Sequence, residues 1–251
     1  MQNANLTENI AQVRAWLAAA PQVAVLTGAG VSAESGVPTF REVQTGYWAQ
    51  FDPQDMASEA GFRAHSERVW NWYAHRRQLL AQVQPNAAHH ALARYAQRRP
   101  GALQLITQNV DGLHLRAGSQ DTIALHGDVF AQRWLDAPCP VCDLDAALAA
   151  GGAPPRCPAC GNAVRPGVVW FGEHLPAGAL AQAEAAVQQC ALMLVVGTSG
   201  AVYPAAGLVF QAHQRSVPVV IINPEPTELD MLAQVRLEGP AAQLLPALLD
   251  E

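Results

Sequence analysis

Two pairs of cysteines have the spacing of a zinc site. Cys139 and Cys142 form one Cys-x-x-Cys pair, and Cys157 and Cys160 form a second pair after fourteen intervening residues. Four thiolates at this spacing can close a tetrahedral Zn²⁺ site, which leaves no coordination position for water or substrate. We therefore predict one structural zinc ion per chain, and the reacting groups must lie elsewhere.

The histidine of Leu125-His126-Gly127, thirteen residues before the first cysteine, is the first candidate for a reacting group. An imidazole suits a general base because its unperturbed pKa lies near the pH at which most enzymes work. A lone histidine is also commonly a structural residue with satisfied hydrogen bonds, and residue type alone leaves both interpretations open.

A glycine-rich segment, Gly28-Ala29-Gly30, follows a short apolar run. Glycines let the backbone approach a pyrophosphate, and the start of a following helix offers free N–H groups to it. The spacing departs from G-x-G-x-x-G because the third glycine, Gly36, comes three residues late. The segment therefore indicates a dinucleotide site, and a plain strand-to-helix turn is the competing interpretation.

Four short apolar runs predict strands buried on both faces of a parallel sheet, at residues 23–26, 103–106, 192–196 and 217–222. Each run is followed by small or hydrogen-bonding residues, and ligands bind at the carboxyl ends of strands in open parallel sheets. The pattern predicts an α/β fold with a Rossmann-like parallel sheet and one ligand crevice. A helix is expected over residues 8–20, capped by Thr7.

Two segments interrupt this alternation: residues 42–84 are helical and aromatic-rich, and residues 130–169 hold the cysteines. We expect them to form a smaller lobe on a single domain spanning residues 1–251, whose large part comprises approximately residues 1–41, 85–129 and 170–251. Residues 145–155, rich in Ala, Gly and Pro, are expected to be a loop. The fifth cysteine, Cys190, precedes an apolar run and is expected in the core.

Composition limits the partners and the compartment. The chain has a net charge of −6, with 15 arginines and no lysine, so nucleic acid binding is not expected. No apolar run could span a bilayer and no signal peptide begins the sequence, which favours a cytoplasmic protein without a membrane partner. In that compartment paired cysteines favour metal over disulfides. We expect a monomer.

Motifs along nearly the whole chain, in family order, resemble those of the sirtuins, the NAD-dependent protein lysine deacylases. They occupy residues 28–41, 107–114, 125–127, 168–173, 197–199 and 222–224, together with the paired cysteines. The resemblance implies that NAD is consumed as a co-substrate and that acyl-lysine proteins are the partners. The products would be nicotinamide, free lysine and O-acyl-ADP-ribose.

The resemblance also implies roles for particular residues. His126 matches the general base, and Asn109 is the second residue assigned to catalysis. Gln108, Asn109 and Asp111 match the residues that hold the nicotinamide ribose and carboxamide, although Asn and Asp after a strand are also common helix caps. The full set expected at NAD is Gly28, Ala29, Gly30, Ser32, Glu34, Pro38, Thr39, Phe40, Arg41, Gln108, Asn109, Asp111, His126, Gly197, Thr198, Ser199, Asn223, Pro224, Glu225 and Ala241.

The acyl group is predicted from Tyr73 and Arg76, which share a helix face. Their Tyr-x-x-Arg spacing matches the subgroup that removes succinyl, malonyl and glutaryl groups, and Ala57 matches the small residue that leaves room for them. A packed tyrosine and a solvated arginine are the alternative interpretation. Plain deacetylation, protein mono-ADP-ribosylation and a non-enzymatic zinc-ribbon binding protein stay open as functions.

One further segment is expected to bind substrate. Val168, Val169, Trp170 and Phe171 resemble the strand that pairs with substrate peptide backbone, a mode that leaves side-chain choice loose. Gly167, directly before it, stands where the family often has a larger residue.

Overall fold

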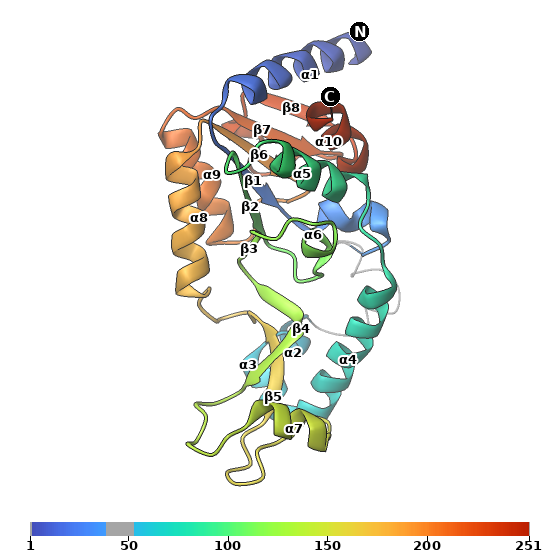
Figure 1. Cartoon of the computed structure of the whole chain (residues 1–251), viewed down its shortest axis with the longest axis vertical. Coiled ribbons are helices and arrows are strands. Elements are labelled where there is room, and N and C mark those ends of the chain that lie inside the picture. The colour runs from blue at the N-terminus through green and yellow to red at the C-terminus, as the bar shows by residue number, and fades with distance from the viewer. Residues whose placement is uncertain (1, 39–52, 251) are drawn as a thin grey trace.

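The structure is a computed structural model of the 251-residue chain and describes residues 2–38 and 53–250. The molecule is elongated, with a large sheet-containing part at one end and a smaller part at the other (Figure 1). Both termini lie at the end that holds the large sheet. Among the described helices, none is long and apolar enough to cross a membrane.

A six-stranded parallel sheet in the order β3-β2-β1-β6-β7-β8 forms the large part. The strands are β1 (Val23–Thr27), β2 (Leu103–Thr107), β3 (Ile123–Ala124), β6 (Leu192–Val196), β7 (Val219–Asn223) and β8 (Val235–Glu238). The predicted Rossmann-like α/β fold is confirmed. Of the four predicted strands, the last begins two residues later than expected, and β3 and β8 were not predicted.

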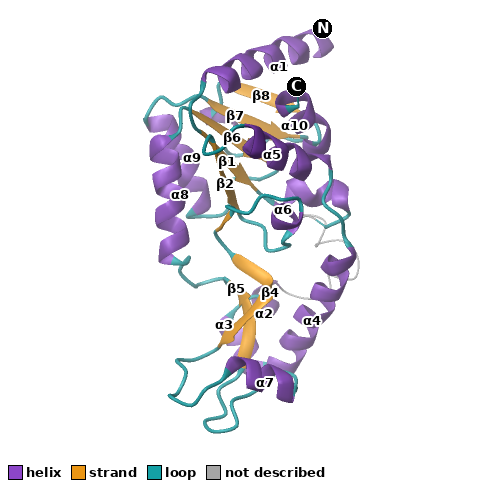
Figure 2. Ribbon diagram, in the orientation of Figure 1, coloured by secondary structure: helices purple, strands orange, loops and turns teal. Residues whose placement is uncertain are grey.

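Helices cover both faces of this sheet (Figure 2). On one face are α1 (Gln2–Ala19), α5 (Ala87–Arg98) and α10 (Ala241–Leu249), and on the other are α8 (Ala177–Gln189) and α9 (Ala205–Gln214). Side chains alternate along β1, so Val23 and Val25 join the first core while Ala24 and Leu26 join the second. This alternation explains why the run is continuously apolar. The fifth cysteine, Cys190, is buried in the second core, as predicted.

The smaller part has its own apolar core, which includes Phe62, Val69, Tyr73, Val129 and Val164. Its elements are α2 (Pro53–Met56), α3 (Glu59–Ala64), α4 (Ser66–Gln82), α7 (Leu144–Ala150) and the antiparallel pair β4 (Gly127–Trp134) and β5 (Val164–Val168). Three short elements complete the described chain: η1 (Ala29–Ser35), α6 (Leu113–Arg116) and η4 (Asp230–Leu232).

Two local predictions are wrong. The first helix begins at Gln2, so Thr7 lies inside it and does not cap its start. Residues 145–155 are not a continuous loop, because α7 occupies the first half. The Asp143 side chain caps that helix by accepting the N–H of Ala146 at 3.0 Å, and alanine is the strongest helix former.

Candidate active site

The ends of four neighbouring strands meet at one edge of the sheet, as the sequence predicted. β2, β1, β6 and β7 are consecutive in the sheet, so the segments that follow them lie side by side. Main-chain bonds join these segments: the Gly28 N–H donates to the carbonyl of Val196 at 2.9 Å, and the Gln108 N–H donates to the carbonyl of Thr27 at 3.0 Å. The edge is therefore one connected surface.

The glycines of this edge are required by close backbone packing. The Gly30 N–H donates to the Gly197 carbonyl at 2.8 Å, and a Cβ on Gly30 would lie 2.7 Å from the Gly197 Cα. Gly197 itself has φ +62°, a conformation that favours glycine. The segment after Gly28 is the short 3₁₀ helix η1, where the sequence predicted an ordinary helix start.

A cluster of polar side chains lies beneath this edge. The amide of Asn109 donates to the Gly28 carbonyl at 3.1 Å and to the Ser32 hydroxyl at 3.2 Å. The Ser32 hydroxyl donates to a carboxylate oxygen of Asp111 at 2.8 Å, and the other oxygen accepts the N–H of Leu113 at 3.0 Å. Burial nevertheless raises the pKa of Asp111, because desolvation outweighs these donors. Asn109 and Asp111 are thus joined through Ser32, and Asp111 also binds the first N–H group of α6.

Two histidines of this cluster were missed by the sequence analysis. His89 Nε2 lies 3.4 Å from the Ser32 hydroxyl, and its ring centroid is 4.8 Å from that of His114. His114 Nε2 is 3.0 Å from the Thr27 hydroxyl. Burial lowers the pKa of His89 to about 4 and that of His114 to about 3, so both rings are neutral near pH 7. The available signals were the capping-box spacing from Asn86 to His89 and the position of His114 at the end of the motif at residues 107–114.

His126 has the hydrogen bonding that a general base needs. Its Nδ1 lies 2.8 Å from the carbonyl oxygen of Gln108. Because a carbonyl only accepts, Nδ1 must carry the proton, which leaves Nε2 with a free lone pair. Burial lowers the pKa of His126 and the bond to Gln108 opposes that shift. The ring is therefore held neutral and in one tautomer, directly before β4.

The three residues predicted to bind the acyl group all belong to the smaller part. Tyr73 is 4% exposed, and its hydroxyl accepts the indole N–H of Trp170 at 3.0 Å. Burial raises the pKa of Tyr73 and lowers that of Arg76, while Tyr73 and Asp111 act electrostatically on Arg76 in the opposite direction. The carbonyl of Ala57 accepts the N–H of Phe171 at 2.8 Å. Arg76 thus stands within electrostatic reach of both the phenol and the polar cluster.

The segment predicted to pair with substrate already uses several of its main-chain groups. The N–H of Val169 donates to the carbonyl of His126 at 2.8 Å, and the N–H of Trp170 donates to the Glu173 carboxylate at 2.8 Å. With Phe171 bonded to Ala57, three consecutive N–H groups are occupied. Backbone pairing with a peptide at this segment stays a prediction, and it would have to use the carbonyl groups or displace one of these bonds.

The four cysteines of the paired motifs come together. Their sulfur atoms all lie within 4.8 Å of one another, with 3.3 Å between those of Cys139 and Cys142 and 3.6 Å between those of Cys142 and Cys160. Zn–S bonds of about 2.3 Å would place the sulfurs of a tetrahedral site about 3.8 Å apart. Main-chain N–H groups lower the pKa of the Cys157 thiol, while burial and the neighbouring thiols raise that of Cys142, so the four thiols titrate together. The cluster fits a structural Zn²⁺ site.

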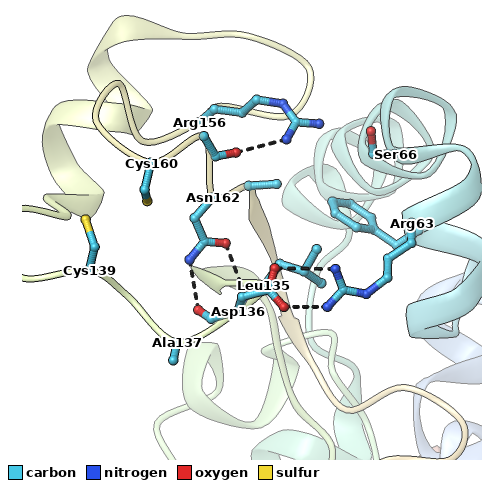
Figure 3. Close-up of a pocket in the computed structure, with 12 residues that line it drawn as sticks. Arg63, Ser66, Leu135, Asp136, Ala137, Cys139, Arg156, Cys160 and Asn162 are labelled. Carbon is cyan, nitrogen blue, oxygen red and sulfur yellow. Dashed lines mark hydrogen bonds and ion pairs between the residues drawn. The ribbon is translucent and has the colours of Figure 1, made fainter.

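A pocket beside this cluster contains none of the predicted catalytic residues (Figure 3). It lies between α3–α4 and the cysteine-bearing segment, and Arg63 faces Asp136 across it. Asn162 holds Asp136 through two main-chain bonds of 2.9 and 3.1 Å. The pocket is therefore a contact region between two segments.

The remaining predicted contacts are spread along the same sheet edge. The Thr198 hydroxyl accepts the amide of Gln108 at 3.1 Å, and the amide of Asn223 donates to the carbonyl of Glu225 at 2.7 Å. Ala241 is buried at the start of α10. The other residues are Ala29 and the exposed Glu34 in η1, the exposed Pro38 after it, Ser199 in the loop after β6, and Pro224 after β7. Thr39, Phe40 and Arg41 lie outside the described residues.

Comparison with known proteins finds close relatives. Residues 28–204 match the family model described as the Sir2 family. The NAD-dependent protein deacylase of Ralstonia nicotianae is 56% identical over 239 residues, which cover 95% of each chain. A solved Sir2 homologue in complex with NAD superposes with a TM-score of 0.81 at 39% identity, covering 95% of this chain and 91% of that one. A second solved structure, Sir2Tm bound to a propionylated peptide, superposes with a TM-score of 0.76 at 30% identity. The match covers 91% of this chain and 92% of that one.

Proposed function

The chain belongs to the Sir2 family, and on that premise we propose that it is an NAD-dependent protein lysine deacylase that prefers succinyl, malonyl and glutaryl groups. The main support for the catalytic assignment is His126, which Gln108 holds in one tautomer. Gln108 directly precedes Asn109, which belongs to the polar cluster with Ser32 and Asp111. The observation that carries the preference is the pair of Tyr73 and Arg76.

NAD, as the co-substrate, supplies an electrophilic ribose carbon that the acyl-lysine oxygen attacks as nicotinamide leaves. The protein's task is to position groups and to move one proton. His126 Nε2 accepts the proton of a ribose hydroxyl, which makes that oxygen able to attack the acyl carbon. The Gln108 carbonyl stabilises the resulting imidazolium through its bond to Nδ1. Asn109 and Asp111 hold the nicotinamide ribose end, and their mutual link through Ser32 fixes their orientation.

The rest of the cofactor would lie along the strand ends. The close approach of Gly28 and Gly30 to Gly197 and Thr198 leaves backbone, without side chains, beside the crevice. That arrangement suits the pyrophosphate, because backbone that carries no side chain can lie close to it. Ser199, Asn223, Glu225 and Ala241 are assigned to the adenosine half. Zn²⁺ on the four cysteines supports the smaller part and takes no part in the reaction.

The acyl preference follows from the chemistry of two side chains. The buried phenol of Tyr73 is neutral and can donate a hydrogen bond, and the Arg76 guanidinium brings a positive charge to the same helix face. Together they match a carboxylate through charge-assisted hydrogen bonds. An acetyl group would leave Arg76 without its anionic partner in a largely buried position, which weakens binding.

The test is to incubate the purified protein with NAD and matched succinyl-, glutaryl-, malonyl- and acetyl-lysine peptides, and to identify the products by mass spectrometry. We expect nicotinamide, free lysine peptide and O-acyl-ADP-ribose, formed fastest from the dicarboxylic substrates. Equal or higher kcat/KM on acetyl-lysine would reject the acyl preference. ADP-ribose covalently attached to protein, without loss of the acyl group, would identify a transferase instead.

Two variants with matched controls assign the roles. His126→Asn should abolish every activity, while His90→Asn, at an exposed position on α5, should not. Arg76→Met should lower kcat/KM for succinyl-lysine by about 10- to 100-fold, the range for losing a hydrogen bond to a charged group. Arg68→Met, at an exposed position of the same helix, is its control. Full turnover by His126→Asn would remove this histidine from the mechanism.

A further inference from the structure

The hydroxyl of Tyr73 has a fixed hydrogen-bond role. Tyr73 and Trp170 are 4% and 2% exposed, and the indole nitrogen lies 3.0 Å from the phenol oxygen. An indole N–H can only donate, so the phenol oxygen must accept at this contact. A phenolic hydrogen prefers to lie in the ring plane on one of two sides. With the indole on one side, the hydrogen of Tyr73 is directed to the other.

Trp170 is held firmly enough to impose this direction. The guanidinium carbon of Arg165 lies 3.3 Å from the centroid of the Trp170 ring, and Arg165 is 2% exposed. Arg165 forms an ion pair with Glu173, whose carboxylate also accepts the main-chain N–H of Trp170 at 2.8 Å. Both the backbone and the ring of Trp170 are therefore fixed by the same pair of charges.

The position of Arg165 itself is determined by main-chain acceptors. Its guanidinium donates to the carbonyl of Val168 at 2.9 Å and to that of Pro166 at 3.3 Å. A buried ion pair contributes little net stability compared with apolar residues of the same volume, because both charges lose their hydration. What such a pair adds is a defined geometry, here at the ring whose N–H reaches Tyr73.

We infer that Trp170, supported by Arg165 and Glu173, is a positioning residue for acyl-group selection: its indole N–H directs the Tyr73 proton toward the acyl carboxylate. The inference rests on the proposed preference for dicarboxylic acyl groups and names the residues that sustain it. A phenol whose proton is already directed does not have to be ordered when the substrate binds, so the hydrogen bond to the carboxylate forms at lower entropic cost. Acetyl-lysine, which lacks the carboxylate, gains nothing from this direction.

The test is a double-mutant cycle on selectivity, defined as the ratio of kcat/KM for succinyl-lysine to that for acetyl-lysine. Trp170→Phe removes the N–H and keeps an aromatic ring over Arg165. We expect the ratio to fall about 3- to 10-fold, the range for one hydrogen bond, mainly through a higher KM for the succinyl peptide. In a Tyr73→Phe background, the same substitution should leave the ratio unchanged, because no hydroxyl remains to be directed.

Two controls distinguish a specific fall in the selectivity ratio from misfolding of the variant. Trp134→Phe, at the far end of β4 in the same lobe, makes the same ring change and should leave the ratio unchanged. Should Trp170→Phe fold poorly by circular dichroism, replacement of Trp170 with 3-benzothienylalanine removes only the N–H and keeps the ring shape. The same fall in ratio is expected from that replacement.

The outcomes distinguish two failures. A wild-type protein with no preference for succinyl-lysine would reject the proposed acyl preference, and the inference with it. A wild-type preference that Trp170→Phe leaves intact, or lowers equally in both Tyr73 backgrounds, would overturn the inference alone.

Discussion

Gly167 offers a direct test of how tightly the two strands next to His126 are packed. It lies in β5 opposite the irregular part of β4, and a Cβ on it would lie 2.7 Å from the Ala131 Cβ and 3.0 Å from the Ala131 carbonyl group. Carbonyl atoms cannot give way without moving the strand. Gly127, with φ +79°, approaches from the same side, where a Cβ would lie 2.2 Å from the Gly167 oxygen.

The expected cost of Gly167→Ala follows from these distances. Inserting a methyl group into a closely packed region typically costs about 1–3 kcal/mol. In a chain of this size each kcal/mol lowers Tm by about 2–4 °C, so the variant should unfold about 2–12 °C below the wild type. Because β4 begins directly after His126, a displaced strand should also lower kcat.

Thermal unfolding followed by circular dichroism measures the effect. Gly207→Ala in α9 is the matched control: a Cβ there meets nothing within 4 Å, and alanine in a helix is favoured over glycine by up to about 1 kcal/mol. Ala131→Gly in the Gly167→Ala background should restore only part of the lost Tm, since it removes the Cβ contact at 2.7 Å and leaves the two carbonyl contacts at 3.0 Å. A Gly167→Ala variant as stable as the wild type would refute the packing argument.

Three further outcomes are expected. A strong chelator should remove one Zn²⁺ per chain, measured by atomic absorption, and lower both Tm and deacylation, and Cys157→Ser should do the same. The free energy of unfolding should fall as the pH drops from 6.5 toward 4, by about 1.4 kcal/mol per pH unit for each buried histidine, because the unfolded chain binds protons that His89 and His114 do not. His89→Gln should reduce the slope of the free energy of unfolding against pH, measured by urea titrations at several pH values. An unchanged slope would contradict the assignment of this pH dependence to His89. Arg63→Gln should change stability by less than about 1 kcal/mol, because its ion pair with Asp136 is half exposed.

The sheet was predictable because its strands are buried on both faces. Residues 23–26 alternate between two apolar cores, so every position had to be apolar and the run was visible without any partner. β3 has two residues, and β8 has four in which Arg236 and an exposed glutamate alternate with apolar residues, so neither gives such a signal. The helix α7 was missed because glycine and proline around it outweighed the alanines and the Asp143 cap.

The glycines of the segment after β1 have a packing requirement that the sequence pattern did not reveal. A pyrophosphate contact was expected to explain Gly28 and Gly30, yet their nearest neighbours are Gly197 and Thr198, in a loop more than 160 residues later in the chain. The requirement for glycine at Gly30 arises from that loop whether or not a ligand is present. A substitution there would therefore lower stability as well as affinity, and activity alone could not separate the two.

The proposed acyl pocket includes a contact that no local sequence pattern could reveal. The Tyr-x-x-Arg spacing identified Tyr73 and Arg76 on one helix, but the donor to the Tyr73 hydroxyl comes from Trp170, 97 residues away. The family resemblance implies that Trp170 belongs to a strand that pairs with substrate backbone, and it does not indicate the contact with Tyr73. The main-chain N–H of Trp170 already donates to Glu173, and its indole N–H donates to Tyr73. In the role that we infer for Trp170, its effect on acyl selection passes through the Tyr73 hydroxyl, which makes the selectivity ratio, and not total activity, the quantity that reports on it.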